Sequence, residues 1–331
     1  MSDKIKILFI NLGGIGDEIL FLPTICAVRK KFQDAEITLC TEHRSRAIRD
    51  LTDCFDKLYT IKQNKNRYCE LLKLIIFAQF QQYDYVISSG SNSLIPLLLW
   101  LTGAKKRIGF EGSKFQKLLT TAVKLDNQRY AAEMYFELVK ELTHKDFSAP
   151  RITIKEEQSI IENSVLIHPG VSAMSRNKSI IKTFNGKIWA EIIDKLLEKG
   201  KKVILAGGPD DKQVYDEIIL NLKHIDNNNF LDYYGKTKNI MDLAKLINNT
   251  QILLCSDSAP MHIGVALDKR VAAIFGPTDE KKLIPQKDNF MVIKNTNCSC
   301  RPCLWDKRQT TCAELKCIQI DIENIINCLI N

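Results

Sequence analysis

The 331-residue sequence has no hydrophobic run long enough to cross a membrane. Its most apolar segment, SLIPLLLWLTG at 93–103, is about half the length of a bilayer-spanning helix and contains Pro96, so we expect a buried helix there. A secretory signal is also lacking, because the first residues, MSDKIKILFINLGG, form a short apolar run that stops at glycine. We therefore expect a cytoplasmic protein, in which the 11 cysteines are poor candidates for structural disulfides.

The sequence also lacks a dense block of Lys and Arg with interleaved aromatic residues, which argues against nucleic acid as a partner. Lys and Arg number 47 and Asp and Glu 39, giving a formal net charge of +8. This excess serves solubility and also favours anionic partners such as phosphates or an acidic membrane surface. With 45% hydrophobic and 26% charged residues, the chain has a globular profile and is long enough for two domains.

Apolar runs of strand length alternate with helical segments in both halves of the chain. The strand-like runs are KIKILFINL, EITLCTE and YDYVISSG, followed by SVLIHPG, KKVILAGGPDD, QILLCSD and RVAAIFGPTD. A polar stretch at 137–164 separates the two series. We therefore predict a doubly wound α/β fold with domains at 1–155 and 156–331, and a C-terminal helix from about residue 321. A ligand is expected between the halves, at the carboxyl ends of the strands.

The first candidate site is the loop GGIGDE at 13–18, directly after the first predicted strand. Two glycines of a dinucleotide-binding fingerprint are present and Glu42 follows the second strand, but Ile19 stands where the third glycine is needed. The loop also places Asp17 in the first helical turn, where the helix dipole favours a carboxylate. Asp17 is either a capping acid or a functional group. A nicotinamide-dependent oxidoreductase stays an alternative.

The second candidate site is LLCSDSAPMHIGVAL at 253–267, where a strand stops at Asp257 and a helix starts near Pro260. The free N–H groups and the dipole of a helix start suit a diphosphate, and His262 would add a donor. The alternative is that Asp257 only caps the helix and His262 only packs.

The third candidate site is the loop after SVLIHPG, which is rich in Ser, Asn, Lys and Arg. Placed at a ligand site, it would bring Lys182 or Arg176 to a phosphate. The alternative is a solvated loop, which is the usual case for such a composition.

Five cysteines fall within CSCRPCLWDKRQTTCAELKC at 298–317. In a reducing compartment, clustered thiols favour a soft metal ion such as zinc or iron. Cys300 and Cys303 form a ligand pair that Cys312 and Cys317 would complete, with Cys298 as a further candidate. The spacing is not that of a standard zinc finger, so buried or free thiols are the alternative. Any metal here would be structural, because the other candidate sites lie elsewhere in the sequence.

Taken in order, these motifs resemble glycosyltransferase family 9, the ADP-heptose heptosyltransferases of lipopolysaccharide core assembly. The matching segments are GGIGDEILFLPTICAVRKKFQDAEIT, YDYVISSGSNSLIPLLLWLTGAKKRIGF, LIHPGVSA, KTFNGKIWAEII, LAGGPDD, GKTKNIMDLAKLI and CSDSAPMHIGVALDKRVAAIFGPTDE, of which the last is the most specific. The resemblance implies a GT-B architecture, with two Rossmann-like domains whose parallel sheets face across a cleft. The N-terminal domain would take the acceptor and the C-terminal domain the nucleotide sugar.

The resemblance also implies roles for individual residues. Asp17 matches the catalytic carboxylate, and Lys182 matches a lysine that contacts phosphate. The donor segment corresponds to Asp257, Ser258, Ala259, Met261 and His262, with Ser172 in the preceding loop, and the acceptor-side loop to Gly13, Gly14 and Gly16. The family usually has Gly at position 259, Pro at 270 and Trp-Pro at 184–185, where this chain has Ala259, Arg270, Phe184 and Asn185. These departures affect the donor geometry, and hence the choice of nucleotide sugar.

The reaction implied is an inverting, metal-independent transfer of heptose from ADP-heptose to a hydroxyl of a lipopolysaccharide core or lipid A-type acceptor. A protein acceptor of the autotransporter type is the alternative. A carboxylate can take the proton of the attacking hydroxyl, while a helix start and a lysine offset the charge of the leaving diphosphate. The sequence has no Asp-x-Asp motif to hold a metal, and no cofactor is expected for catalysis. A peripheral contact with the cytoplasmic face of the inner membrane is expected. A binding module without turnover is disfavoured by the presence of Asp17 and Lys182.

Overall fold

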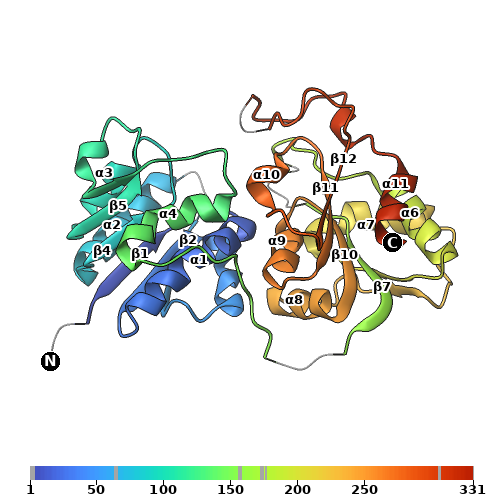
Figure 1. Ribbon diagram of the computed structural model, residues 1–331, viewed down its shortest axis with the longest axis horizontal. Coiled ribbons are helices and arrows are strands. Elements are labelled where there is room, and N and C mark those ends of the chain that lie inside the picture. Colours follow the sequence, from blue (N-terminus) through green and yellow to red (C-terminus); the bar gives the residue numbers. More distant parts are fainter. Residues whose placement is uncertain are drawn as a thin grey trace. The chain divides into compact units, whose positions relative to one another are not determined.

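The computed structural model describes residues 4–62, 66–155, 159–171, 175, 177–304 and 307–330. The chain divides into two compact units, Met1–Thr153 (unit 1) and Ile154–Asn331 (unit 2). Each unit is built on a six-stranded parallel sheet with helices on both faces (Figure 1). The predicted α/β fold with two Rossmann-like units is confirmed.

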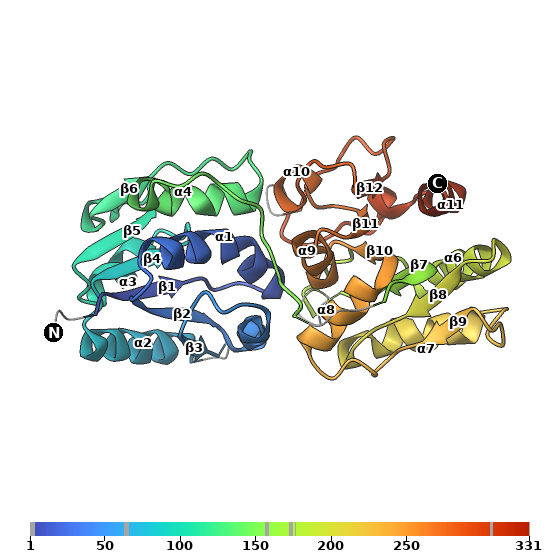
Figure 2. The same ribbon diagram turned by 60° about the horizontal axis from the view of Figure 1, so that its bottom comes forward.

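The sheet of unit 1 has the strand order β3-β2-β1-β4-β5-β6, which is followed from bottom to top in Figure 2. Its strands are β1 (Lys6–Ile10), β2 (Glu36–Glu42), β3 (Lys57–Ile61), β4 (Tyr85–Ser88), β5 (Lys106–Phe110) and β6 (Thr121–Val123). The central strand β1 is a continuous apolar run because helices cover both faces of the sheet.

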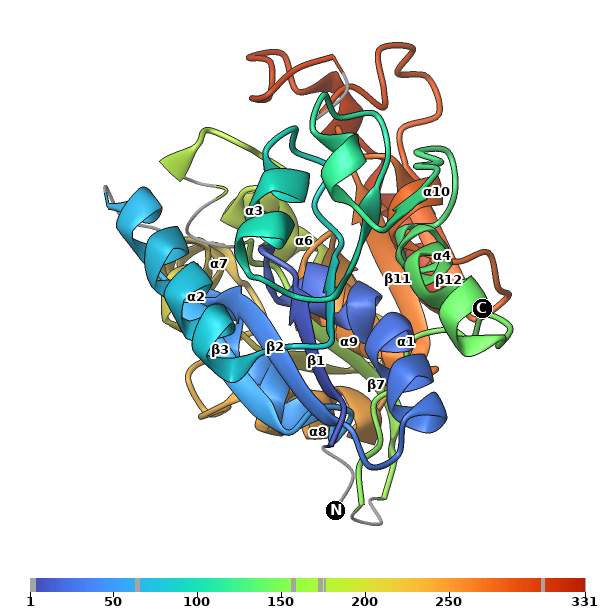
Figure 3. The ribbon, with the colours of Figure 1, turned by 90° about the vertical axis from the view of Figure 1, so that its left-hand side faces the viewer.

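The helices of unit 1 form one layer on each face of its sheet (Figure 3). On one face α1 (Ile15–Lys31) packs against α4 (Ala131–Thr143) and the 3-10 helix η1 (His43–Leu51). The other face carries α2 (Arg67–Gln81) and α3 (Ile95–Leu101). The predicted buried helix at 93–103 is therefore α3, although its Trp100 is 50% exposed. A short 3-10 helix, η2 (Gln116–Leu118), precedes β6.

One disulfide contradicts the expectation from cysteine usage. Cys26 of α1 and Cys54, which follows η1, are joined with their Cα atoms 5.1 Å apart. The expectation rested on the compartment alone, whereas the packing of η1 on α1 brings these two positions within the range of a disulfide.

The sheet of unit 2 has the strand order β12-β11-β10-β7-β8-β9 (Figure 2). Its strands are β7 (Ile161–His168), β8 (Lys202–Leu205), β9 (Phe230–Asp232), β10 (Thr250–Ser256), β11 (Arg270–Phe275) and β12 (Phe290–Lys294). The strands β7 and β10 are neighbours, with His168 opposite Cys255 at their carboxyl ends.

The helices of unit 2 also lie on both faces of its sheet (Figure 1). On one face α6 (Gly186–Glu198), α7 (Lys212–Asn221) and α11 (Ile322–Ile330) enclose a core centred on the fully buried Trp189. The other face carries α8 (Ile240–Asn249) and α9 (Ala259–Ala266). The remaining short elements are η3 (Pro209–Asp211), α10 (Glu280–Leu283) and η4 (Lys316–Ile318). Within the described ranges, we find no helix with the length and apolar character needed to span a bilayer.

The contact between α6 and α7 depends on a glycine. A Cβ atom on Gly186 would lie 2.5 Å from Glu217 Cβ and 2.8 Å from its backbone carbon, too close for any side chain. Gly186→Ala should therefore lower the free energy of unfolding by about 1–3 kcal/mol, the usual cost of overpacking. The measurement is urea unfolding followed by intrinsic tryptophan fluorescence, to which the buried Trp189 contributes.

Gly208→Ala is the matched control, because a Cβ there meets nothing within 4 Å. Its effect should stay within about 0.5 kcal/mol. Equal unfolding midpoints for the two variants would show that α6 and α7 do not approach as closely as described.

Candidate active site

In each sheet the strand order reverses between two neighbouring parallel strands, and ligands of open α/β sheets bind outside the carboxyl ends of such a pair. The pair is β1 and β4 in unit 1, and β7 and β10 in unit 2. The loop that carries Asp17 follows β1, the loop that carries Lys182 follows β7, and Asp257 follows β10. The motifs chosen from the sequence thus lie where the topology places ligands.

Asp17 lies in the first turn of α1 and is partly exposed. Its Oδ2 accepts a hydrogen bond of 2.7 Å from the N–H of Gly14, so the carboxylate does cap the helix. A Cβ on Gly13 would lie only 2.5 Å from Asp17 Cβ, which explains the need for glycine there. Among the described residues, no hydrogen bond to Oδ1 is formed, so one carboxylate oxygen stays available as an acceptor. Gly16 follows as the second residue of α1.

The next residue, Glu18, has the opposite environment. Its side chain is fully buried and accepts a hydrogen bond from Thr41 Oγ1. Burial raises the pKa of Glu18 well above its ordinary value, so we expect the carboxyl to be neutral. Glu18 therefore helps to anchor the start of α1 against β2, and Asp17 is the solvent-accessible acid of the pair.

Three residues around this loop were missed by sequence reasoning. Ser45 donates a hydrogen bond of 2.7 Å to the carbonyl of Gly13, and Asn11 donates one of 3.3 Å to the carbonyl of Asp17. Arg44 Nε bonds Glu42 Oε2 at 2.6 Å, and Arg44 Nη1 comes within 3.4 Å of where a Cβ of Gly14 would be. The sequence signal that could have identified these residues is that polar residues follow the ends of β1 and β2.

In unit 2, Lys182 Nζ lies 3.1 Å from Asp257 Oδ2. The side chains are only 14% and 5% exposed, so this is an almost buried ion pair. Burial alone would raise the pKa of Asp257, but the Lys182 ammonium and then His262 outweigh it and hold the pKa below its ordinary value. The carboxylate is thus ionised at neutral pH. The structure brings together two residues that are 75 positions apart in sequence.

The helix α9 begins directly after this pair. Ser258 is its N-cap residue, but the Ser258 hydroxyl does not cap the helix and instead donates to the carbonyl of Ser256 at 3.2 Å. Ala259 is the first helical residue, and Met261 and His262 are buried. A helix start without a side-chain cap is suited to an anion. Ser172 and Arg176 lie outside the described residues.

The loop that carries Lys182 is held from two sides. Thr311, within the cysteine-rich segment at 298–317, donates a hydrogen bond of 2.9 Å to the carbonyl of Ser179 and accepts one of 3.2 Å from the N–H of Ile181. Thr183 donates to the carbonyl of Pro169 at 2.6 Å. The Thr183 hydroxyl also accepts a bond of 3.0 Å from the indole of Trp189.

Two departures from the family pattern have a structural role here. Phe184 is 2% exposed, and its ring centroid lies 5.4 Å from that of Trp189. Asn185 is the N-cap of α6 and accepts a bond of 3.0 Å from the N–H of Ile188. These residues replace the Trp-Pro pair while still ending the Lys182 loop in a packed helix start.

A buried histidine and a buried aspartate lie close together near the same loop. His168 Nε2 lies 3.8 Å from Asp211 Oδ2, and both residues are buried. Burial lowers the pKa of His168, although the neighbouring Asp211 carboxylate acts against it. A Cβ on Gly170 would lie 1.7 Å from Asp211 Oδ1, so the chain can leave β7 here only through glycine.

The expected zinc or iron site at the cysteine cluster is not supported. Across the described parts of the chain, no group of three or more His, Cys, Asp or Glu is placed to hold a metal ion. Cys298 and Cys300 have their sulfur atoms 3.4 Å apart. Burial raises the pKa of the Cys303 thiol, and that of Cys317 to about 11. Cys312, also free, does not complete a ligand set. The alternative of buried or free thiols agrees better with the structure, because cysteine spacing does not give thiol geometry.

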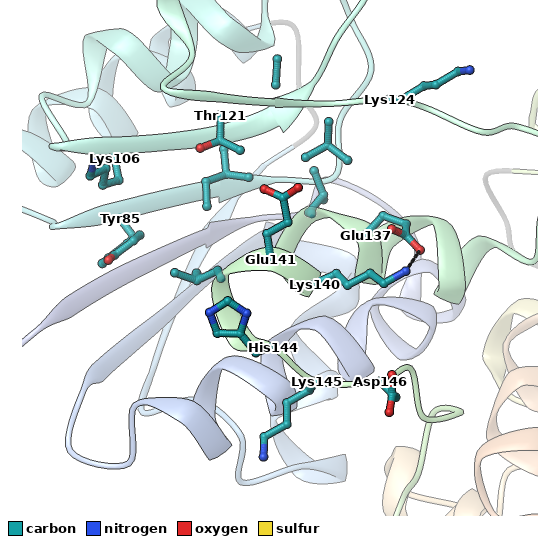
Figure 4. Close-up of a pocket in the computed structure, with 15 residues that line it drawn as sticks. Tyr85, Lys106, Thr121, Lys124, Glu137, Lys140, Glu141, His144, Lys145 and Asp146 are labelled. Carbon is teal, nitrogen blue, oxygen red and sulfur yellow. Dashed lines mark hydrogen bonds and ion pairs between the residues drawn. The ribbon is translucent and has the colours of Figure 1, made fainter.

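Two cavities were found among the described residues, and neither is lined by Lys182 or Asp257, although the second borders the Lys182 loop. The larger, of about 910 Å³, is in unit 1 between α4 and the strands β5 and β6 (Figure 4). It reaches Tyr85, Lys106 and Thr121, the first residues of their strands, and so lies at the amino ends of the sheet. The other, of about 710 Å³, is in unit 2 beside Ile180 and Phe184. The first cavity is at the wrong end of the strands for the predicted site.

Comparisons with known proteins agree with this geometry. A model of glycosyltransferase family 9 (heptosyltransferase) matches residues 78–314. Lipopolysaccharide heptosyltransferase 3 of Escherichia coli is 23% identical over 295 residues, covering 83% of this chain and 85% of its own. Among solved structures, a glycosyl transferase family 9 protein from Veillonella parvula aligns with a TM-score of 0.76 at 20% identity, covering 100% of this chain and 99% of its own. The E. coli ADP-heptose lps heptosyltransferase II aligns with a TM-score of 0.73 at 18% identity, covering 98% and 99%.

These matches define the class of the protein as a glycosyltransferase. The chain belongs to glycosyltransferase family 9. The predicted family and GT-B fold are confirmed, and the oxidoreductase alternative is wrong. In a dinucleotide-binding domain, Glu42 would have to bind the ribose hydroxyls. Its side chain is only 2% exposed and is paired with Arg44, which agrees with the rejection of the oxidoreductase.

The Lys182–Asp257 pair makes a prediction about stability. Lys182→Met leaves a buried carboxylate without its ammonium, so the free energy of unfolding at pH 7 should fall by about 3 kcal/mol. Because the pKa of Asp257 is lowered in the folded state, the pair stabilises the protein above pH about 4. That contribution is lost as the pH falls through the lowered pKa, so the difference between the proteins should shrink there. Urea unfolding at several pH values measures it.

Lys212→Met is the control, since Lys212 pairs with Asp216 while 69% exposed. It should cost less than about 1 kcal/mol at any pH. A difference between Lys182→Met and wild type that does not depend on pH would contradict the assigned ion pair.

Proposed function

We propose that this glycosyltransferase transfers a heptose from ADP-heptose to a hydroxyl of a lipopolysaccharide core or lipid A-type glycan. The observation that carries the proposal is the lysine held at an uncapped helix start, Lys182 beside Asp257 and α9. A cation and free N–H groups in one place suit a diphosphate. Heptose as the sugar and lipopolysaccharide as the acceptor are proposed by analogy with the related E. coli lipopolysaccharide heptosyltransferases.

Asp17 is proposed as the general base. A sugar hydroxyl is a poor nucleophile at neutral pH, and a carboxylate within hydrogen-bond reach can take its proton as attack proceeds. The free Oδ1 would accept that proton, while Oδ2 stays on the N–H of Gly14 and keeps the side chain in place. A single displacement, with the base on one face of the sugar and the leaving group on the other, inverts the anomeric centre.

The leaving group in this proposal is ADP. Lys182 and the first N–H groups of α9 offset the negative charge that develops on the diphosphate as the glycosidic bond to it breaks. A buried Asp257 keeps the ammonium in position and leaves the remaining Nζ hydrogens for the phosphate oxygens. Transfer is proposed to need no metal, because these groups supply the positive charge. Ser172 remains a proposed donor contact.

The acceptor is proposed to bind unit 1 at the loop of Gly13, Gly14 and Gly16. A protein acceptor is the alternative to the glycolipid. Mass spectrometry of the products formed from ADP-heptose with a panel of glycolipid and protein acceptors separates the two. The enzyme is proposed to act at the cytoplasmic face of the inner membrane, where a lipid-borne acceptor would be reached.

The base assignment makes the first functional prediction. Asp17→Asn should leave ADP affinity unchanged and lower kcat by about 100-fold or more, because an amide cannot take the proton. Initial rates of ADP release from ADP-heptose with acceptor measure the effect. Asp34→Asn, an exposed acid of the same unit, is the control and should keep the wild-type rate. Near-normal turnover of Asp17→Asn would remove the base assignment.

The assignment of Lys182 to the donor site makes the second functional prediction. Lys182→Ala should weaken ADP binding by about 10- to 100-fold, since a hydrogen bond to a charged group contributes roughly 1.5–3 kcal/mol. Isothermal titration calorimetry with ADP measures the affinity, and Lys212→Ala serves as the control. Unchanged affinity in Lys182→Ala would place the diphosphate elsewhere.

A further inference from the structure

The helix α2 is apolar on two sides, although only one side is covered. Leu74 and Ala78 are buried against the sheet, and Leu71, Ile75 and Phe77 pack on the same core. The opposite side carries Tyr68, Leu72, Ile76 and Phe80, spaced four residues apart and 83%, 56%, 45% and 82% exposed. A helix that is hydrophobic all round is normally buried, and contiguous exposed apolar residues mark an interaction site.

The neighbouring helix α3 carries a further exposed aromatic residue. Gln79 of α2 donates a hydrogen bond of 2.9 Å to the carbonyl of Leu101, which joins the carboxyl ends of the two helices. Trp100, one residue before, is 50% exposed. We call the row of Tyr68, Leu72, Ile76 and Phe80 the α2 face, and it includes a tyrosine and a phenylalanine. Trp and Tyr are enriched at the interface between water and lipid.

The α2 face has a basic border. Residues 62–82 contain four Lys or Arg, against one acid, Glu70. Glu70 Oε2 accepts a bond of 3.3 Å from the N–H of Lys62, and Glu70 Oε1 bonds Lys73 Nζ at 2.8 Å. Lys62 is therefore held near α2, and Arg67 is the first residue of the helix.

We propose that the α2 face docks on an anionic lipid membrane. Tyr68, Leu72, Ile76 and Phe80 would enter the boundary between headgroups and acyl chains, while Arg67 and Lys73 meet lipid phosphates. Apolar side chains bordered by Lys and Arg are typical of helices that lie in a membrane interface. A second copy of the chain is a poorer occupant, because two such faces would bring like charges together. The surface belongs to unit 1, the proposed acceptor unit, and suits an acceptor carried on a lipid.

Flotation with vesicles tests the proposal on the full chain. Wild-type protein should bind phosphatidylglycerol-containing vesicles about tenfold more strongly than vesicles of phosphatidylcholine, and the preference should fall with added salt. The double variant Leu72→Ser with Phe80→Ser should lose about tenfold or more of this binding, because two exposed apolar anchors are removed. Leu220→Ser is the control, since Leu220 is 85% exposed on α7 of unit 2 and should not matter.

Vesicle binding needs neither donor nor acceptor. The membrane proposal can therefore fail while the proposed heptose transfer stands, and the proposed transfer can fail while the protein still binds vesicles. Calorimetry with ADP should give the same affinity for the double variant and wild type, which shows that the variant is folded. Equal vesicle binding by wild type and double variant would overturn the proposal, as would no binding of wild type. Light scattering that shows a wild-type dimer and a monomeric double variant would assign the α2 face to a second copy instead.

Discussion

The ion pair between Lys182 and Asp257 is the interaction on which the candidate site depends. Two charges that are almost buried are stable only while each keeps the other within hydrogen-bond distance. Asp257 is placed by the end of β10, and Lys182 by a loop that Thr311, Thr183 and the core around Trp189 hold. The packing of unit 2 thus fixes the position of the Lys182 ammonium near the start of α9.

Unit 1 shows how burial separates two neighbouring acids. Asp17 and Glu18 are adjacent in sequence, yet successive helical positions point in different directions. Glu18 faces the sheet and burial raises its pKa, whereas Asp17 faces the loop and bonds an amide with one oxygen only. The proposed base is therefore chosen by helix geometry, and Gly13 is needed so that the carboxylate can reach the loop backbone.

Much of this could be predicted from the sequence. Alternating apolar runs predicted the α/β class, and Asp17, Lys182 and residues 257–262 were selected as site candidates because each follows a strand whose end is visible as a motif. Residues that act over long sequence distances were missed. Thr311 supports a loop 130 residues away, and Arg44 approaches Gly14 from another strand end. The Cys26–Cys54 disulfide was not expected, and the sequence could not decide between a metal site and free thiols at 298–317, because cysteine counts and compartments do not show which sulfur atoms meet.

Hydrogen–deuterium exchange with and without ADP is the most direct measurement of the central claim, that the cation beside α9 receives the diphosphate. ADP should slow exchange in the amide groups at 257–263 and in the loop at 177–183, and leave those at 11–18 unchanged. Slower exchange in the glycine loop at 11–18, with no change around α9, would contradict the account.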